Sequence, residues 1–279
     1  MNRKDFYRKL VCAVMGGYVL TAVACAPQKE EVAGTEVLET EWMETEISEE
    51  MESVGGETVE VAVTEIVTAE IETQVQEVQT EEKESSWVAD LDVAETASQI
   101  IVVAADGSSA TVSMHNKEKD GSWTELLCTD GKIGRNGIGK TKEGDGKTPT
   151  GVYRFLFGFG NMPDPECGLN YTQVDDSYYW VDDSDSACYN QFVTTNEVTI
   201  DWDSAEHIAG VKRSYNYVLA LDYNAERVPG KGSAIFMHCT PTSGAGCIAL
   251  PEEMMVEIMR NVEAGCVVVI DSVEGVMGY

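Results

Sequence analysis

The stretch Gln99-Ile100-Ile101-Val102-Val103-Ala104 is an unbroken apolar run behind one polar residue, and the turn signal Asp106-Gly107 ends it. A short apolar run that is rich in β-branched residues and closed by a turn is typical of a buried strand. The run therefore predicts that a folded, strand-rich domain begins near residue 98 of this 279-residue chain.

More strand signals follow this run. Residues 111–115 alternate between apolar and polar, and Asp120-Gly121 separates them from residues 123–128, which predicts a hairpin. Because many short strands and few helices characterise sandwiches and barrels, the sequence predicts a mainly β fold, a β-sandwich or a barrel-like sheet. Later runs that fit strands are 151–157, 178–181, 215–222, 234–237 and 266–270.

One helix is predicted in the C-terminal region, from Pro251 to about Val262. Proline occupies its first position, and Glu252 and Glu253 lie in its first turn, where acidic residues favour a helix. Apolar residues recur at helical spacing, at Met254, Met255, Ile258, Met259 and Val262.

An acidic segment precedes the predicted domain. Residues 26–86 contain 19 glutamates and only two lysines, so more than half of the chain's net charge of -30 falls there. Like charges repel, and a segment with few aromatic residues cannot bury enough apolar surface to order itself. We therefore predict a disordered acidic linker over residues 26–97, as a tether or simply a solubilising spacer. The acidic balance argues against nucleic-acid binding and against electrostatic docking to anionic lipid.

The first 25 residues fit a targeting segment. Four basic residues precede an apolar run from Leu10 to Ala24, which is shorter than the ~20 residues of a membrane span. Small residues lead to Cys25, which resembles a bacterial lipobox, although Ala22 stands where leucine is usual. We predict a signal peptide with a lipobox over residues 1–25, and Cys25 as the lipidated residue. An ordinary secretory signal cleaved after Ala24 is the alternative, and both predict export.

The segment Ser233–Pro251, SAIFMHCTPTSGAGCIALP, carries the clearest chemical signal. It predicts a strand ending at His238, a loop of small residues, and then Cys247. A loop of this length can fold back and bring the imidazole within hydrogen-bond reach of the thiol, as a cysteine nucleophile requires. Gly244 and Gly246 allow close backbone approach, and the amides of Gly246 and Cys247 are candidates for an oxyanion site. On spacing alone, two core residues would be the commoner explanation.

Two motifs in this order resemble the L,D-transpeptidase catalytic domain (YkuD-like) family of peptidoglycan cross-linking enzymes. His238-Cys239-Thr240 leads through a glycine-rich turn to Gly246-Cys247-Ile248, and Gly144–Tyr153 is similar to the family's K-T-P-x-G-x-Y strand. The resemblance spans about residues 98–270 and predicts a catalytic domain over 98–279. It implies that Cys247 is the acylated nucleophile and that His238 donates and accepts the proton.

The reaction that the resemblance implies is transfer of a stem-peptide acyl group through a cysteinyl thioester, with no metal and no other cofactor. Its partners are peptidoglycan stem peptides, contacted by Thr240, Gly244 and Ala245, on a lipid-anchored protein that faces the cell wall. Ala245 and Ala249 stand where the family usually has histidine and arginine. The alternatives are a non-catalytic wall-binding lipoprotein, or an L,D-carboxypeptidase or other cysteine hydrolase.

The remaining cysteines and histidines have structural interpretations. Export permits disulfides, and Cys167 with Cys188 is the pair that we expect, because both lie in a polar loop region. Cys128 and Cys266 lie in apolar strands and are predicted to be buried thiols. We expect His115 and His207 to be ordinary, partly exposed residues.

Overall fold

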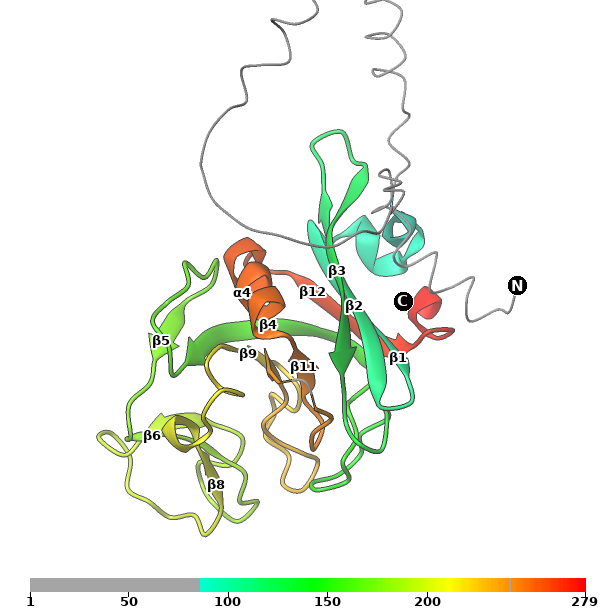
Figure 1. Ribbon diagram of the computed structural model, residues 1–279. Coiled ribbons are helices and arrows are strands. Elements are labelled where there is room, and N and C mark those ends of the chain that lie inside the picture. Colours follow the sequence, from blue (N-terminus) through cyan, green and yellow to red (C-terminus); the bar gives the residue numbers. More distant parts are fainter. Residues whose placement is uncertain (1–85, 241) are drawn as a thin grey trace, which may run out of the picture. The chain divides into compact units, whose positions relative to one another are not determined.

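The computed structural model describes residues 86–240 and 242–279 (Figure 1). The predicted signal peptide and most of the predicted acidic linker lie outside these residues. In the part of the chain that is described, no helix has the length and apolar character needed to cross a bilayer.

The described residues form twelve strands, one α-helix and four short 3-10 helices. The strands are β1 (Gln99–Asp106), β2 (Ser109–Lys117), β3 (Trp123–Lys132), β4 (Gly151–Gly160), β5 (Tyr171–Gln173), β6 (Tyr178–Val181), β7 (Phe192–Thr194), β8 (Ala205–His207), β9 (Val218–Leu221), β10 (Phe236–Cys239), β11 (Ile248–Leu250) and β12 (Val267–Ser272). The helices are η2 (Trp87–Asp90), η3 (Asp92–Glu95), η4 (Ile208–Gly210), α4 (Glu252–Asn261) and η5 (Val276–Gly278).

Eight strands close into a barrel in the order β12-β1-β2-β3-β11-β10-β9-β4, because β12 pairs with both β1 and β4. Strand β5 extends the sheet beyond β4. The long strand β4 crosses beneath α4, and the β2–β3 hairpin stands beside them (Figure 1). The prediction of a mainly β domain with one helix near its C-terminal end is confirmed. Of the two arrangements that the sequence left open, the β12–β4 pairing selects the barrel.

The barrel interior and α4 share one apolar core. Ile101 and Val103 of β1 point into it, and Met255, Ile258 and Met259 of α4 pack against the same cluster. Burying a side chain of this size contributes about 1.5–3 kcal/mol. Burial of its apolar face therefore holds this short helix in place more than helix propensity does.

The opposite face of β1 is also covered. Ile100 and Val102 pack against Val88, Leu91 and Ala94 from the η2–η3 segment. Burial on both faces explains why β1 is an unbroken apolar run. The segment belongs to the folded part, which therefore begins before Ser98, the predicted start. Its apolar residues recur every third position, as a 3-10 helix requires, within a composition otherwise like that of the linker.

A separate three-stranded sheet, β7-β6-β8, covers the outer face of the barrel at β9 and β10. Trp180 of β6 packs edge-on against Phe236 of β10, with ring centroids 4.8 Å apart. Cys247 belongs to the same cluster, which we call the aromatic layer: Phe159, Trp180, Ile208, Tyr215, Val218, Ala220, Ala234, Phe236 and Cys247. The layer buries the surface on which the predicted catalytic residues lie.

His115 contradicts the expectation of partial exposure. Its side chain is 0% exposed, and its two ring nitrogens lie 2.8 Å from the hydroxyls of Ser86 and Ser113. The η2 region covers it, with the Trp87 ring 5.8 Å away, and this contact could not be foreseen from β2 alone. Burial lowers the pKa of His115 to about 4, so the ring is neutral at pH 7.

The neutral state of His115 predicts how stability depends on pH. Its pKa is lower in the folded state than in the unfolded state, so its contribution to stability is complete above the unfolded pKa of 6.5 and is lost as the pH falls towards 4. The full loss is about 3 kcal/mol. Glutamine does not titrate, so we expect the difference in unfolding free energy between wild type and His115→Gln to shrink over this interval.

Urea denaturation of both proteins at pH 7, 5.5 and 4 measures this difference. Glu125, whose pKa burial raises to about 7, opposes the trend, and its Oε2 lies 3.9 Å from Nε2 of His115. Repeating the comparison in a Glu125→Gln background removes this second titration and isolates His115. Parallel stability curves for the two proteins would contradict the prediction.

Candidate active site

Strands β10 and β11 place the two predicted catalytic residues on one surface. They run parallel, with Met237 opposite Ile248 and His238 opposite Ala249. Met237 and Cys239 point into the barrel core, and Phe236 points into the aromatic layer, so alternation along β10 places His238 on the layer side as well. Cys247 immediately precedes β11 and lies in the aromatic layer. The fold therefore places His238 and Cys247 on the same face of neighbouring strands.

The loop between these strands is anchored by the second predicted motif. The buried hydroxyl of Thr148 donates to the carbonyl of Gly246 at 2.7 Å and accepts from the amide of Gly134 at 2.9 Å. The amide of Arg135 donates to the carbonyl of Gly244 at 2.9 Å. A Cβ on Gly246 would lie 2.6 Å from the carbonyl oxygen of Lys147, so only glycine fits there. The two motifs, far apart in sequence, are thus in direct contact.

Cys247 is a protonated, buried thiol in this structure. It is 8% exposed, and its Sγ donates to the carbonyl oxygen of Ala234 at 3.2 Å. Ala234 has a φ of 53°, a left-handed backbone conformation that is uncommon for alanine. Burial, followed by the negative charge of Glu206, raises the pKa of Cys247 to about 12. The thiolate is therefore scarce at neutral pH in this arrangement.

His238 is buried with one ring nitrogen free. It is 7% exposed, and its Nδ1 has no hydrogen-bond partner among the described residues. Burial lowers its pKa to about 4, against the opposing effect of the backbone at Cys239 and Ser214. Tyr215 packs edge-on against the ring, with centroids 5.4 Å apart. A buried nitrogen without a partner is uncommon, and in a neutral imidazole such a nitrogen is suited to exchange a proton.

The predicted hydrogen bond between the thiol and the imidazole is not present within the described residues. The sulfur engages Ala234 instead, and Nδ1 of His238 is left without a partner. The two side chains lie on the same face of neighbouring strands without a hydrogen bond between them.

The other predicted site residues lie around this pair. The amides of Gly246 and Cys247 form no hydrogen bond with any described residue, which leaves them available as donors. Thr240 donates its amide to Leu250 at 3.0 Å, and its hydroxyl lies 3.3 Å from that of Thr242. Gly244 bridges to Gly134, and Ala245 is exposed. These residues follow the loop from β10 to β11, with Ala245 at its surface.

Three residues at this site were missed by the sequence reasoning. Tyr215 packs on His238, and Ala234 accepts the thiol hydrogen bond. Glu206 accepts a hydrogen bond from the Tyr215 hydroxyl. No local motif marks any of them: Glu206 comes with β8 of the small sheet, whereas Tyr215 and Ala234 lie in the segments before β9 and β10.

The predicted Cys167–Cys188 disulfide is wrong. Both residues are free thiols, as are Cys239, Cys247 and Cys266 in the described part of the chain. Cys167 packs against the barrel core, whereas the amide of Cys188 is bound by Ser186 in the loop after β6. Their different surroundings, rather than their shared polar sequence context, keep them apart. The predicted burial holds for Cys266, which is 2% exposed, and only in part for Cys128.

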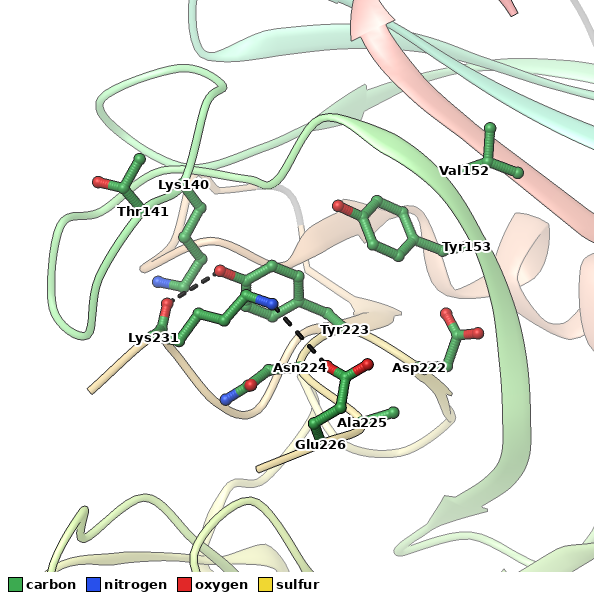
Figure 2. Close-up of a pocket in the computed structure, with 10 residues that line it drawn as sticks. All are labelled: Lys140, Thr141, Val152, Tyr153, Asp222, Tyr223, Asn224, Ala225, Glu226 and Lys231. Carbon is green, nitrogen blue, oxygen red and sulfur yellow. Dashed lines mark hydrogen bonds and ion pairs between the residues drawn. The ribbon is translucent and has the colours of Figure 1, made fainter. Parts of the chain in front are cut away.

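A pocket of about 610 Å³ lies next to this site and not at it. Its wall includes two cationic residues, Lys140 and Lys231, and two acidic ones, Asp222 and Glu226 (Figure 2). Lys231 lies 4.0 Å from Glu226, and the Tyr223 hydroxyl donates to the Lys231 carbonyl at 2.9 Å. Neither Cys247 nor His238 lines the pocket. Lys140 lines the pocket and also acts on the candidate site, because its positive charge partly opposes the rise in the pKa of Cys247.

Residues 98–270 match the model of the L,D-transpeptidase catalytic domain, YkuD. Comparison with curated proteins gives no match.

Three solved structures are similar to the chain at low identity. One is an L,D-transpeptidase from Mycobacterium smegmatis, with 15% identity, 63% of this chain and 59% of that chain covered, and a TM-score of 0.32. Another is L,D-transpeptidase 1 from Mycobacterium tuberculosis, with 15% identity, coverage of 62% and 61%, and a TM-score of 0.29. The third, from Stackebrandtia nassauensis, has 11% identity, coverage of 63% and 57%, and a TM-score of 0.29. The chain therefore spans about three fifths of the length of these structures.

The anchoring role of Thr148 predicts a clear difference between two substitutions. Thr148→Val keeps the shape but removes the hydroxyl, so the Gly134 amide and the Gly246 carbonyl both lose a buried partner. Because each unsatisfied group costs about 1–3 kcal/mol, we expect a loss of about 2 kcal/mol or more in unfolding free energy, measured by urea denaturation.

Thr148→Ser is the matched control. It keeps the hydroxyl and loses one methyl group, for an expected cost of about 1 kcal/mol. If the serine variant were as unstable as the valine variant, packing of the methyl group and not the two hydrogen bonds would anchor the loop.

Proposed function

Since the chain belongs to the L,D-transpeptidase catalytic domain family, we propose that it is a cysteine-dependent acyltransferase that cross-links peptidoglycan stem peptides through a thioester on Cys247. The observation that carries this proposal is the unpartnered Nδ1 of His238, a buried neutral imidazole on the same surface as the Cys247 thiol. A nucleophile and a base within reach of one another are the minimum that covalent acyl transfer needs.

Formation of the thioester begins with activation of the thiol. The Cys247 side chain turns from the Ala234 carbonyl towards His238, whose neutral ring accepts the proton. The thiolate attacks the carbonyl of the L,D peptide bond of a donor stem. We assign stabilisation of the oxyanion that develops to the amides of Gly246 and Cys247, which donate to no other described residue. His238 then returns the proton to the departing terminal D-residue, and a thioester remains on Cys247.

The second half of the reaction releases the thioester. An amine on a neighbouring stem attacks the thioester carbonyl, the carbon–sulfur bond breaks, and the Cys247 thiol is regenerated. Attack by water would give L,D-carboxypeptidase activity instead. We assign donor contacts to Thr240, Gly244 and Ala245, which follow the loop into Cys247. Alanines at 245 and 249, where the family usually has histidine and arginine, indicate that this chain contacts the stem peptide through other groups.

One feature of the site favours a second candidate function, a wall-binding domain without turnover. Burial keeps the Cys247 thiol protonated, and the thiol donates its hydrogen bond to the Ala234 carbonyl and not to His238. In a binding domain this resting arrangement would be permanent. In an enzyme it must open to admit the acyl group.

Acylation of the intact protein separates these two functions. We expect a carbapenem to add one adduct to the native protein, seen as a mass increase, and none to Cys247→Ala. His238→Gln should acylate at least about 100-fold more slowly, the usual contribution of a general base. Cys239→Ala is the matched control, because Cys239 is also a buried free thiol with a pKa raised to about 12, and it should acylate normally.

Failure of the native protein to form an adduct, or an adduct that maps to another cysteine, would favour the wall-binding function. Muropeptide analysis of treated peptidoglycan then tests the product. New L,D-linked dimers are expected, and trimmed monomers alone would indicate a carboxypeptidase.

We further propose that the protein is exported and held to the membrane by lipid on Cys25, so that it faces the cell wall. Residues 26–97, apart from the folded η2–η3 segment, are the proposed linker. Basic residues, then an apolar run, then small residues precede Cys25, and this order supports the proposal. In a bacterial host, mass spectrometry of the mature protein should find diacylglycerol on Cys25 as the first residue. Cys25→Ala should remain unprocessed. A mature chain that begins at an unmodified Cys25 would indicate ordinary secretion.

A further inference from the structure

Glu206 enters the aromatic layer from the small sheet. It lies on β8 directly opposite Trp180 of β6, and paired residues on neighbouring strands project from the same face. Trp180 packs against Phe236 within the layer that also holds Cys247. Glu206 therefore faces the nucleophile across an apolar surface, and its charge is the second-largest cause of the raised pKa of Cys247.

A chain of contacts joins Glu206 to the predicted base. The Tyr215 hydroxyl donates to Oε2 of Glu206, and the Tyr215 ring packs edge-on against His238 with centroids 5.4 Å apart. Among the described residues, no group donates to Oε1 of Glu206. One carboxylate oxygen is thus held in place beside the catalytic pair, and the other is available to a ligand.

Glu206 has carboxylate neighbours but no cation. Asp182 and Glu143 lie close enough to add to the effect of burial, and together these raise the pKa of Glu206 to about 6. The ion pairs found in the described part of the chain involve none of these three carboxylates, and Lys140 is engaged by Asp145 at 3.1 Å. Burying carboxylates without a counter-charge is unfavourable, so the cluster favours a positively charged ligand.

Unpartnered polar atoms around the same cluster point to a missing ligand. Oδ1 of Asp182 is buried and has no hydrogen-bond partner. Ser233, 5% exposed, has an unpartnered hydroxyl, and its amide donates to Glu143 at 3.3 Å. No group of three or more acidic, histidine or cysteine residues in the described ranges is arranged to hold a metal ion, which favours an organic cation.

We propose that Glu206 binds the ammonium group of the acyl acceptor and takes its proton, so that the free amine can attack the thioester on Cys247. This inference rests on the proposed function and adds a specificity-determining residue to it. The ligand class is a primary amine that is protonated in water, such as the side-chain amine of a stem peptide.

The proposed step is balanced in atoms and charge. The ammonium gives one proton to the Glu206 carboxylate, which leaves a neutral amine and a carboxylic acid. The amine nitrogen forms a bond to the thioester carbonyl carbon, the carbon–sulfur bond breaks, and the second amine proton goes to the Cys247 sulfur through His238. The products are an amide, a free thiol and a protonated Glu206, which returns its proton to solvent.

The test separates the two halves of the reaction. In the full-length protein, Cys247 is first acylated with a donor stem peptide, and transfer is then measured by mass spectrometry with two acceptors. One is a stem peptide with a protonated side-chain amine, and the other is hydroxylamine, which is uncharged at neutral pH. We expect Glu206→Gln to acylate at least as fast as wild type, because loss of the charge removes one cause of the raised pKa of Cys247. The variant should lose about 100-fold in transfer to the charged amine and keep transfer to hydroxylamine.

Two further variants control the test. Glu197→Gln makes the same change at an exposed position near the same small sheet and should behave as wild type. Glu206→Asp keeps the carboxylate and should restore part of the transfer. If Glu206→Gln fails to acylate because it does not fold, the aspartate variant decides, since it should retain a preference for the charged acceptor.

The pH profile provides a second readout. The groups that face Glu206 are Tyr215, Asp182, Glu143 and Cys247, and the raised pKa of about 6 belongs to Glu206 in their presence. Transfer to the charged amine should rise with pH through about 6, and this rise should vanish in Glu206→Gln.

The outcomes distinguish failure of this inference from failure of the proposed function. If wild type and Glu206→Gln transfer equally to the charged amine, the role of Glu206 is overturned while the transferase remains. An equal loss with both acceptors would make Glu206 a structural residue and also overturn the inference. Failure of the native protein to acylate would overturn the proposed function itself.

Discussion

The protonation states of the residues at the candidate site depend on burial of the outer face of β10. The β7-β6-β8 sheet covers that face with aromatic side chains, and Trp180 on Phe236 is its central contact. Burial in this layer keeps the His238 imidazole neutral and the Cys247 thiol protonated, and it raises the pKa of Glu206. A charged group is costly in such surroundings, so His238 and Cys247 are held in their neutral forms and Glu206 ionises only at a higher pH than an exposed glutamate. The same layer that raises the pKa of the Cys247 thiol lies beside His238 and Glu206.

The barrel supplies the rigid support for this layer. Pairing of β12 with β4 closes the ring, and the interior core holds β10 and β11 from behind. The loop between β10 and β11 is held by the hydroxyl of Thr148, which binds Gly246 of the loop and also Gly134. The position of Cys247 is thus set by a contact between two segments about a hundred residues apart. This contact fixes the loop backbone, and within it the Cys247 sulfur is directed to the carbonyl oxygen of Ala234.

Much of the fold could be predicted from local patterns. The run at 99–104 and the hairpin after it became β1, β2 and β3, and the amphipathic segment after Pro251 became α4. Strands β5, β7, β8 and β11 have only three residues each, too few for a period to stand out from the background. His115 and the η2–η3 segment were misjudged for a related reason: each is buried by the other, and neither carries that information in its own sequence.

The sequence by itself determined which residue types are available for the chemistry. The order His238, glycine-rich turn, Cys247, with the Gly144–Tyr153 motif upstream, indicated the family that the domain match then showed. Only the tertiary structure decided what surrounds them. It left Cys167 and Cys188 as separate thiols, directed the Cys247 sulfur to Ala234, and brought Tyr215 and Glu206 to the site. The physical reason is that reactivity depends on burial and on neighbouring charge. Both are properties of packing between segments that are distant in sequence, whereas strand and helix patterns arise from neighbours along the chain.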